Sequence, residues 1–163
     1  GREWQVATIQ LDVNMPERFD LTCVDEKGKK ERIVIIHAAI MGSLERYLAI
    51  LIEHFAGAFP LWLSPVQVRV IPISEKFKTY AEEVMRALAA AGIRSELAAT
   101  NETLGKRIRA AELEKIPYAL VVGEKEMKAA SVAVRHRARG DQGMLSLNNF
   151  ILKLQKEIRE KTI

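Results

Sequence analysis

The side chains that most often carry chemistry are few and scattered in this sequence. His37, His54 and His136 do not have the mutual spacing of metal ligands. Cys23 is the single cysteine, which excludes an internal disulfide and a cysteine-only metal cluster. Neither a Gly-x-x-x-x-Gly-Lys nor a Gly-x-Gly-x-x-Gly phosphate-binding pattern is present. Taken one by one, these residues predict no particular reaction.

One segment places polar side chains at the ends of regular elements. Residues 33–37 form an apolar strand that ends at His37, and a Gly-Ser turn ending at Ser43 precedes a helix with Arg46 in its first turn. Arginine clamps phosphate charge through a planar, permanently charged fork. The residues leave alternatives open. Arg46 either binds phosphate or pairs with a nearby glutamate, and His37 is either a ligand or a hydrogen-bonded core histidine.

Hydrophobic periodicity predicts the elements that position this segment. Residues 8–13 alternate apolar and polar side chains, as a half-buried strand does. Residues 21–24 and 33–37 flank a polar turn and predict an antiparallel hairpin. Apolar residues then recur at helical spacing over 43–55. The first part of the chain should therefore contain a strand, a hairpin and a helix.

The second part alternates strands and helices. We expect strands at 66–73, 93–98, 117–123 and 131–137, helices at about 75–91, 103–114 and 146–161, a turn or short helix at 124–128, and a loop at 138–143. Strands separated by helices of this length imply a mostly parallel sheet covered on both faces. The expected fold class is therefore α/β.

The net charge changes sign where the pattern of expected strands and helices also changes. Residues 1–64 carry 7 Lys/Arg and 9 Asp/Glu, a net charge of −2, whereas residues 65–163 carry 18 and 12, a net charge of +6. The basic part is a candidate surface for a polyanion, although solvated charges alone could explain it. No run of 18 uncharged apolar residues predicts a membrane span. A single cysteine fits a reducing compartment, and we expect a cytoplasmic protein.

The strand, turn and helix at 36–46 resemble motif 3 of class II aminoacyl-tRNA synthetases. Together with Gly-Arg-Glu-Trp-Gln at 1–5 and Thr-Ile-Gln-Leu-Asp at 8–12, the sequence is similar to the threonyl-tRNA synthetase family. The similarity continues through residues 50–68, 101–109 and 115–126. It implies that the chain is the C-terminal portion of a threonine–tRNA ligase, an ATP-dependent enzyme. We expect this portion to be inactive by itself.

The resemblance also implies a division into two domains. Residues 1–60 should be the last part of the catalytic domain, an antiparallel hairpin and a helix that carries motif 3. Residues 61–163 should be the anticodon-binding domain, a mixed, mostly parallel five-stranded sheet flanked by helices. The family forms homodimers through regions that we expect mostly upstream of this chain.

In the catalytic part, the resemblance assigns roles in binding ATP with Mg, threonine and zinc. It implies Arg46 as the catalytic motif 3 arginine on ATP, Gln5 and Thr8 as further ATP contacts, Gln10 and Ser43 as threonine contacts, and His37 as one of three zinc ligands. The remaining ligands would lie upstream. An open zinc position suits a threonine hydroxyl, because a site that requires this group rejects valine strongly. We expect Cys23 to be a small buried residue rather than a ligand.

In the second part, the resemblance implies contacts to the anticodon of threonine tRNA. The implied contacts are Asn101, Arg109, Glu126 and Arg135. A carboxylate suits exocyclic amines of bases, and arginine and asparagine suit other edges. Further basic residues fit phosphate binding or a solvated face, namely Lys106, Arg107, Arg137 and Arg139.

The sequence departs from the family at several positions, and Ala98-Ala99 replaces a more acidic stretch. The family usually has arginine at the positions of Ala38 and Thr100, and often glutamate at that of Ala110. Two other functions stay open: a non-catalytic RNA-binding module, or a related class II synthetase for proline, glycine or histidine.

Overall fold

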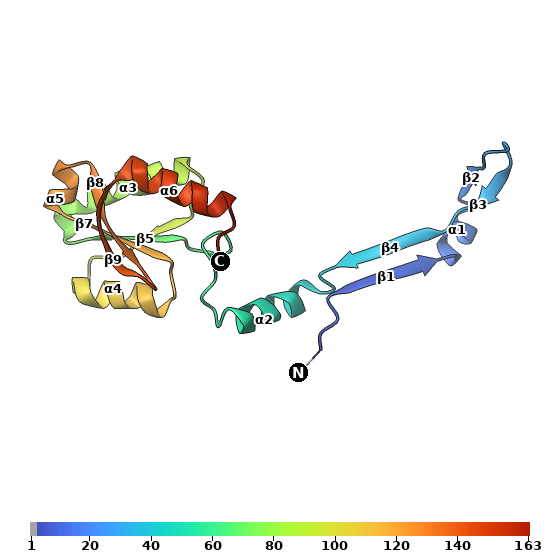
Figure 1. Cartoon of the computed structure of the whole chain (residues 1–163), viewed down its shortest axis with the longest axis horizontal. Coiled ribbons are helices and arrows are strands. Elements are labelled where there is room, and N and C mark those ends of the chain that lie inside the picture. Colours follow the sequence, from blue (N-terminus) through green and yellow to red (C-terminus); the bar gives the residue numbers. More distant parts are fainter. Residues whose placement is uncertain (1–2) are drawn as a thin grey trace. The chain divides into compact units, whose positions relative to one another are not determined.

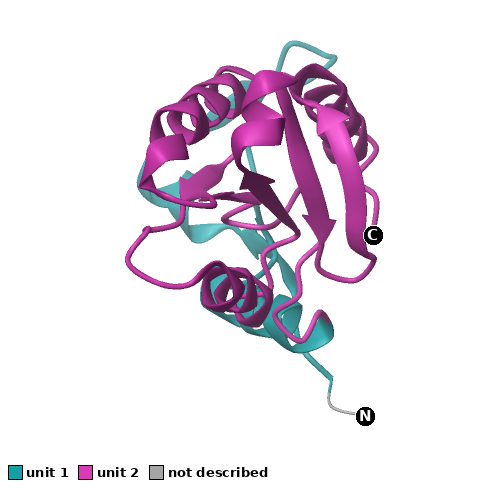
Figure 2. Ribbon diagram, turned by 90° about the vertical axis from the view of Figure 1, so that its left-hand side faces the viewer, with its two compact units in different colours: residues 1–54 teal, residues 55–163 magenta. Residues whose placement is uncertain are grey.

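The computed structural model describes residues 3–163 and divides into two compact units. Unit 1 comprises residues 1–54 and unit 2 comprises residues 55–163 (Figure 2). No helix of the described chain is long and apolar enough to cross a membrane. The two units differ sharply in how many of their side chains are buried.

Unit 1 consists of two small antiparallel pairs and two helices. Its elements are β1 (Ala7–Asp12), α1 (Asn14–Arg18), β2 (Thr22–Val24), β3 (Lys30–Arg32), β4 (Ile35–Ile40) and α2 (Leu44–His54). β1 pairs with β4, and β2 pairs with β3 (Figure 1). Among the described residues of unit 1, only Pro16 is buried. This unit therefore has no hydrophobic core of its own.

The strand pairing in unit 1 differs from the predicted hairpin. The residues that pair with 22–24 are 30–32, whereas 35–40 pairs with β1. The charged β3 strand lacks any apolar signal, and it pairs because the Asp25 carboxylate closes a tight turn by accepting the backbone N–H groups of Lys27 and Lys29. The expectation of a buried Cys23 is also wrong, because both faces of this hairpin are exposed.

Unit 2 is a five-stranded sheet with helices on both faces. Its elements are β5 (Val68–Pro72), η1 (Glu75–Phe77), α3 (Lys78–Ala90), β6 (Ser95–Leu97), α4 (Leu104–Leu113), β7 (Tyr118–Val122), α5 (Glu124–Lys128), β8 (Ser131–His136), β9 (Gly140–Ser146) and α6 (Leu147–Arg159). The strand order is β6-β5-β7-β8-β9. α3 and α6 cover one face and α4 covers the other (Figure 1).

The mixed five-stranded sheet is confirmed, although its parallel character is confined to one half. β5 pairs in parallel with β6 and β7, whereas β7–β8 and β8–β9 are antiparallel. The connection from β7 to β8 holds only the short α5, and a parallel crossover needs a dozen residues or more. The fifth strand, β9, occupies much of the segment that we expected to be a loop at 138–143.

The core of unit 2 lies mainly between the sheet and the α3–α6 layer. Val68 and Val70 of β5 point into this larger cluster, whereas Ile71 joins the smaller cluster beneath α4. Phe150 and Leu154 of α6 are fully buried in the larger cluster. This alternation makes β5 a central strand that holds both layers together.

Candidate functional site

The pairing of β1 with β4 brings the sequence-predicted polar residues to one face. Gln10 lies opposite His37, and Thr8 lies opposite Ala39. Residues directly opposite each other in an antiparallel pair share a face, so Thr8, Gln10 and His37 lie on the same side. The other side is apolar and exposed, with Ile9 and Ile40 among its residues.

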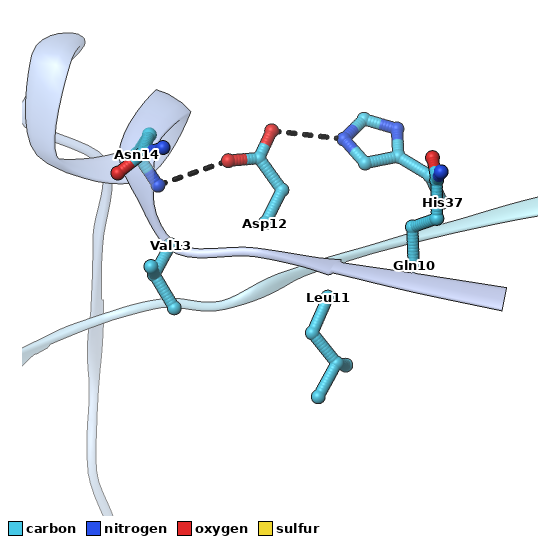
Figure 3. A pocket seen from close by; sticks show the side chains of 6 residues that line it. All are labelled: Gln10, Leu11, Asp12, Val13, Asn14 and His37. Carbon is cyan, nitrogen blue, oxygen red and sulfur yellow. Dashed lines mark hydrogen bonds and ion pairs between the residues drawn. The ribbon is translucent and has the colours of Figure 1, made fainter.

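Asp12 completes this polar face at the end of β1. Its Oδ2 lies 3.0 Å from His37 Nε2, and its Oδ1 accepts the backbone N–H group of Asn14 at 2.9 Å (Figure 3). The same Oδ1 also accepts the Met15 N–H group at 3.0 Å. The Met15 N–H group and then the His37 ring hold the pKa of Asp12 below its ordinary value. We assigned Asp12 no role from the sequence, yet its place two residues after Gln10 in an alternating strand is the signal that could have found it.

The described residues do not form a complete metal site, and His37 is the one predicted ligand among them. The His37 side chain is 53% exposed, so its ring is accessible. No cluster of three or more His, Cys, Asp or Glu residues forms within residues 3–163, and Cys23 lies on the separate β2–β3 hairpin. Zinc sites take three or four such ligands. The donor set thus fits a contribution of one ligand to zinc.

A second cluster forms where the turn after β4 meets the N-terminal segment. Gln5 Nε2 donates to Thr8 Oγ1 at 2.6 Å, and Arg46 Nη1 donates to the Gln5 carbonyl at 3.3 Å. Gly42 has a φ of +61°, and a Cβ there would lie 3.3 Å from the same carbonyl. Glycine therefore allows the close approach that puts Arg46 beside Gln5 and Thr8.

Ser43 is the cap of the helix that carries Arg46. Its Oγ accepts the Arg46 backbone N–H at 3.2 Å and donates to Glu45 Oε2 at 2.9 Å. The N–H group of Glu45 and the Ser43 hydroxyl lower the pKa of Glu45. Within the described chain Arg46 forms no ion pair with Glu45 or Glu53, so its guanidinium stays available on the surface.

In unit 2, two of the four predicted anticodon contacts line one cavity. Arg109 of α4 and Arg135 of β8 face a depression of about 550 Å³. The other lining residues are Gly105, Ile108, Glu112 and Leu113. Arg109 is exposed, and Arg135 lies 3.7 Å from the Asp141 carboxylate. The cavity thus offers two guanidinium groups beside Ile108, Leu113 and the Glu112 carboxylate.

The other two predicted contacts, Asn101 and Glu126, do not line that cavity. Asn101 is exposed in the loop before α4, and its neighbour Thr100 donates a hydrogen bond to Glu75, which lowers the pKa of Glu75. Glu126 Oε2 accepts the Gly123 N–H at 2.9 Å. One oxygen of Glu126 is thereby fixed, and the carboxylate is held at the start of α5.

Comparison with known proteins places these two regions in one family. Residues 67–157 match the family model described as an anticodon binding domain, and residues 1–55 match the tRNA synthetase class II core domain (G, H, P, S and T). The chain belongs to the class II aminoacyl-tRNA synthetases.

Among the class II synthetases, the chain is similar to threonine–tRNA ligases in particular. The chain is 56% identical over 163 residues to a threonine–tRNA ligase of Chloroherpeton thalassium and 52% identical over 163 residues to that of Desulforamulus reducens. These matches cover 100% of this chain and 25% and 26% of the relatives, so it spans about a quarter of their length. A crystal structure of the RNA binding domain of threonyl-tRNA synthetase from Cryptosporidium parvum Iowa II has a TM-score of 0.83 and 40% identity, covering 96% of this chain and 40% of that chain.

Some basic residues of this synthetase chain hold the fold together, and others lie on the surface, where they can meet a ligand. Arg107 is buried, and its guanidinium donates to the carbonyls of Pro72 (2.6 Å) and Ile73 (3.2 Å). Arg137 donates to the carbonyls of Lys115, Ala58 and Phe59. These contacts give both arginines a structural role, which the sequence did not predict. Lys106 pairs with Glu102, and Arg139 is exposed.

Proposed function

We propose that this chain is part of a threonine–tRNA ligase, which joins threonine to its tRNA at the expense of ATP. The identity of 52–56% to threonine–tRNA ligases over the whole chain carries this proposal. It favours threonine over proline, glycine or histidine as the substrate. Residues 1–60 would be the end of the catalytic domain and residues 61–163 the anticodon-binding domain. The two compact units and the two family matches support this division.

On unit 2, the cavity between α4 and β8 would bind an unpaired anticodon base. Arg109 and Arg135 supply donors for acceptor atoms on a base edge or for the adjoining phosphate. Glu126, with one oxygen held by Gly123, would accept from an exocyclic amine, and Asn101 would contact the neighbouring nucleotide. The net positive charge of this part of the chain would attract the RNA backbone.

On unit 1, the two polar clusters would face the two halves of the aminoacylation site. Arg46, with Gln5 and Thr8, would contact ATP, which binds together with Mg, and the fixed positive charge of Arg46 would stabilise the phosphates. Gln10 and Ser43 would contact threonine. His37 would supply one ligand to zinc, which when bound offers an open position to the threonine amino and hydroxyl groups. A homodimer of the full-length enzyme is part of the same proposal.

The test is equilibrium binding of anticodon stem-loop RNAs to the full 163-residue chain. We expect the threonine stem-loop to bind more tightly than stem-loops of other tRNAs, with affinity that falls steeply with salt. Arg109→Ala and Arg135→Ala should each weaken this binding about tenfold, the loss of one good base contact. The matched control is Arg86→Ala on α3, which covers the opposite face of the sheet and should change little.

Two outcomes separate the candidate functions. Binding with the same salt dependence but no preference among stem-loops would contradict the threonine assignment and favour a general RNA-binding module. An equal loss for Arg86→Ala and Arg109→Ala would contradict the location of the site between α4 and β8.

A further inference from the structure

The two carboxylate oxygens of Asp12 have different partners, and this difference constrains the His37 ring. Oδ1 accepts two backbone N–H groups, those of Asn14 and Met15, at 2.9 and 3.0 Å. These groups can only donate, so this oxygen must remain an acceptor. Oδ2 is left to face His37 Nε2 at 3.0 Å (Figure 3).

The ring nitrogen that faces a carboxylate oxygen has to carry the proton. An ionised carboxylate only accepts hydrogen bonds, and a neutral imidazole has one donor and one acceptor nitrogen. Nε2–H therefore donates to Asp12, and Nδ1 keeps its lone pair. Within residues 3–163 no hydrogen bond to Nδ1 of His37 is formed, and more than half of the side-chain surface is accessible.

We propose that Asp12 is a positioning residue that holds His37 in the Nε2–H tautomer and leaves Nδ1 as its metal-ligating atom. The part that concerns the metal rests on the proposed function, whereas the tautomer does not. Metal-binding histidines are commonly fixed in this way, by a carboxylate on the nitrogen that does not touch the metal. Asp12 sits at the end of β1, where the start of α1 anchors its other oxygen, so the carboxylate is held from two sides.

Replacement of Asp12 by asparagine gives a sharp test. The side-chain amide has one C=O and one NH2 group, and the neighbours of Asp12 determine which of the two faces His37. The N–H groups of Asn14 and Met15 still require an oxygen, so the amide NH2 must turn toward His37. An NH2 group can only donate, and Nε2 would have to accept. Asp12→Asn should therefore reverse His37 to the Nδ1–H tautomer while keeping the turn, since asparagine caps such turns as well as aspartate does.

The readout is the pair of ring ¹⁵N shifts of each histidine, measured by NMR on the metal-free 163-residue chain at about pH 8. His136 is an internal control. Its Nδ1 accepts the N–H groups of Ala138 and Arg139, both at 3.2 Å, so it should show the Nε2–H tautomer in both proteins. The expected result is reversal at His37 alone. An unchanged His37 tautomer in Asp12→Asn, or a wild-type protein with Nδ1–H at His37, would overturn the proposal.

A zinc titration of the wild-type chain, followed by the same signals, separates this inference from the proposed function. Zinc that shifts Nδ1 of His37 and leaves its Nε2–H signal in place supports both. Loss of the Nε2–H signal as zinc binds would overturn the assignment of the ligating atom. Because a single imidazole binds zinc weakly, zinc is added in large excess, and a His37 that responds less than the exposed His54 would count against the metal role alone. The Asp12→Asn result would still decide the tautomer.

Discussion

Arg107 and Arg109 lie two positions apart on α4, yet the helix gives them opposite environments. Arg107 turns inward and donates to the carbonyls of Pro72, the last residue of the central strand β5, and of Ile73, which follows it. Arg109 lies on the exposed side and lines the cavity with Arg135. A helix rotates about 100° per residue, so this separation places the two side chains on nearly opposite faces. Because both residues carry the same charge, the sequence could not show that Arg107 is buried in the fold and Arg109 is exposed.

Tyr118 is the residue whose ionisation should be visible in the stability of unit 2. Burial raises the pKa of its hydroxyl well above the ordinary 10.0, and the hydrogen bond that it donates to Glu157 at 2.8 Å raises it further. The folded state then keeps the proton at a pH at which the unfolded chain loses it. The contribution of Tyr118 to the free energy of unfolding is therefore fully present below about pH 10 and is lost as the pH rises above that value.

We expect the free energy of unfolding to fall by about 1.4 kcal/mol per pH unit above pH 10 because of Tyr118. Tyr118→Phe should reduce this slope, while at pH 8 it should cost about 1 kcal/mol for the lost hydrogen bond. Denaturant unfolding from pH 8 to 11 measures both effects. Tyr80, whose raised pKa also has burial as its main cause, is present in both proteins, so the difference between them isolates Tyr118. Identical slopes would contradict the prediction.

Among the elements, β9 and α6 show how a strand and a helix can meet at a single residue. β9 ends at Ser146, whose Oγ accepts the Asn149 N–H at 3.3 Å at the start of α6. The next two turns bury Phe150 and Leu154 against the sheet. The serine side chain thus sets where the strand stops and which face of the helix meets the core.

Ser146→Ala should destabilise unit 2 by about 1 kcal/mol, the usual cost of losing a helix cap. Ser146→Asp should restore the stability, because aspartate accepts the same N–H group and its charge suits a helix N-terminus. The measurement is the midpoint of urea unfolding. If alanine and aspartate destabilised the protein equally, the hydrogen bond to Asn149 would not be the cause.

In the whole molecule, the segment 56–65 belongs physically to unit 2. Gln67 is fully buried, and its Nε2 donates to the Leu61 carbonyl at 2.9 Å. Arg94 donates to the carbonyls of Trp62 and Ser64, and Leu61 is 3% exposed in the main core. These contacts make the crossing part of the fold rather than a free linker.

A fragment of residues 55–163 should therefore fold cooperatively and be more stable than one of residues 66–163. Removal of 55–65 deletes the buried Leu61 side chain, takes the Leu61 carbonyl from Gln67 Nε2, and leaves Arg137 with the Lys115 carbonyl alone. These losses should cost at least about 2 kcal/mol. Denaturant unfolding of the two fragments measures the difference. Equal stabilities would show that the segment adds nothing to the core.

The sequence by itself determined most elements of this protein and its family. Periodicity located most strands and helices of unit 2 because their apolar residues face the two clusters on either side of the sheet, and motif-bearing segments such as 36–46 indicated the family. The tertiary structure decided the pairing of the charged strand β3, the strand β9 with its glycines and polar residues, and the separate fates of Arg107 and Arg109. It also joined Asp12 to His37. The strands β3 and β9 pair with the strands just before them in sequence, but neither has the alternation of apolar residues from which a strand is predicted. The Arg107 contacts and the Asp12–His37 pair join residues distant in sequence, and a local pattern carries no information about which distant carbonyl or carboxylate lies opposite a side chain.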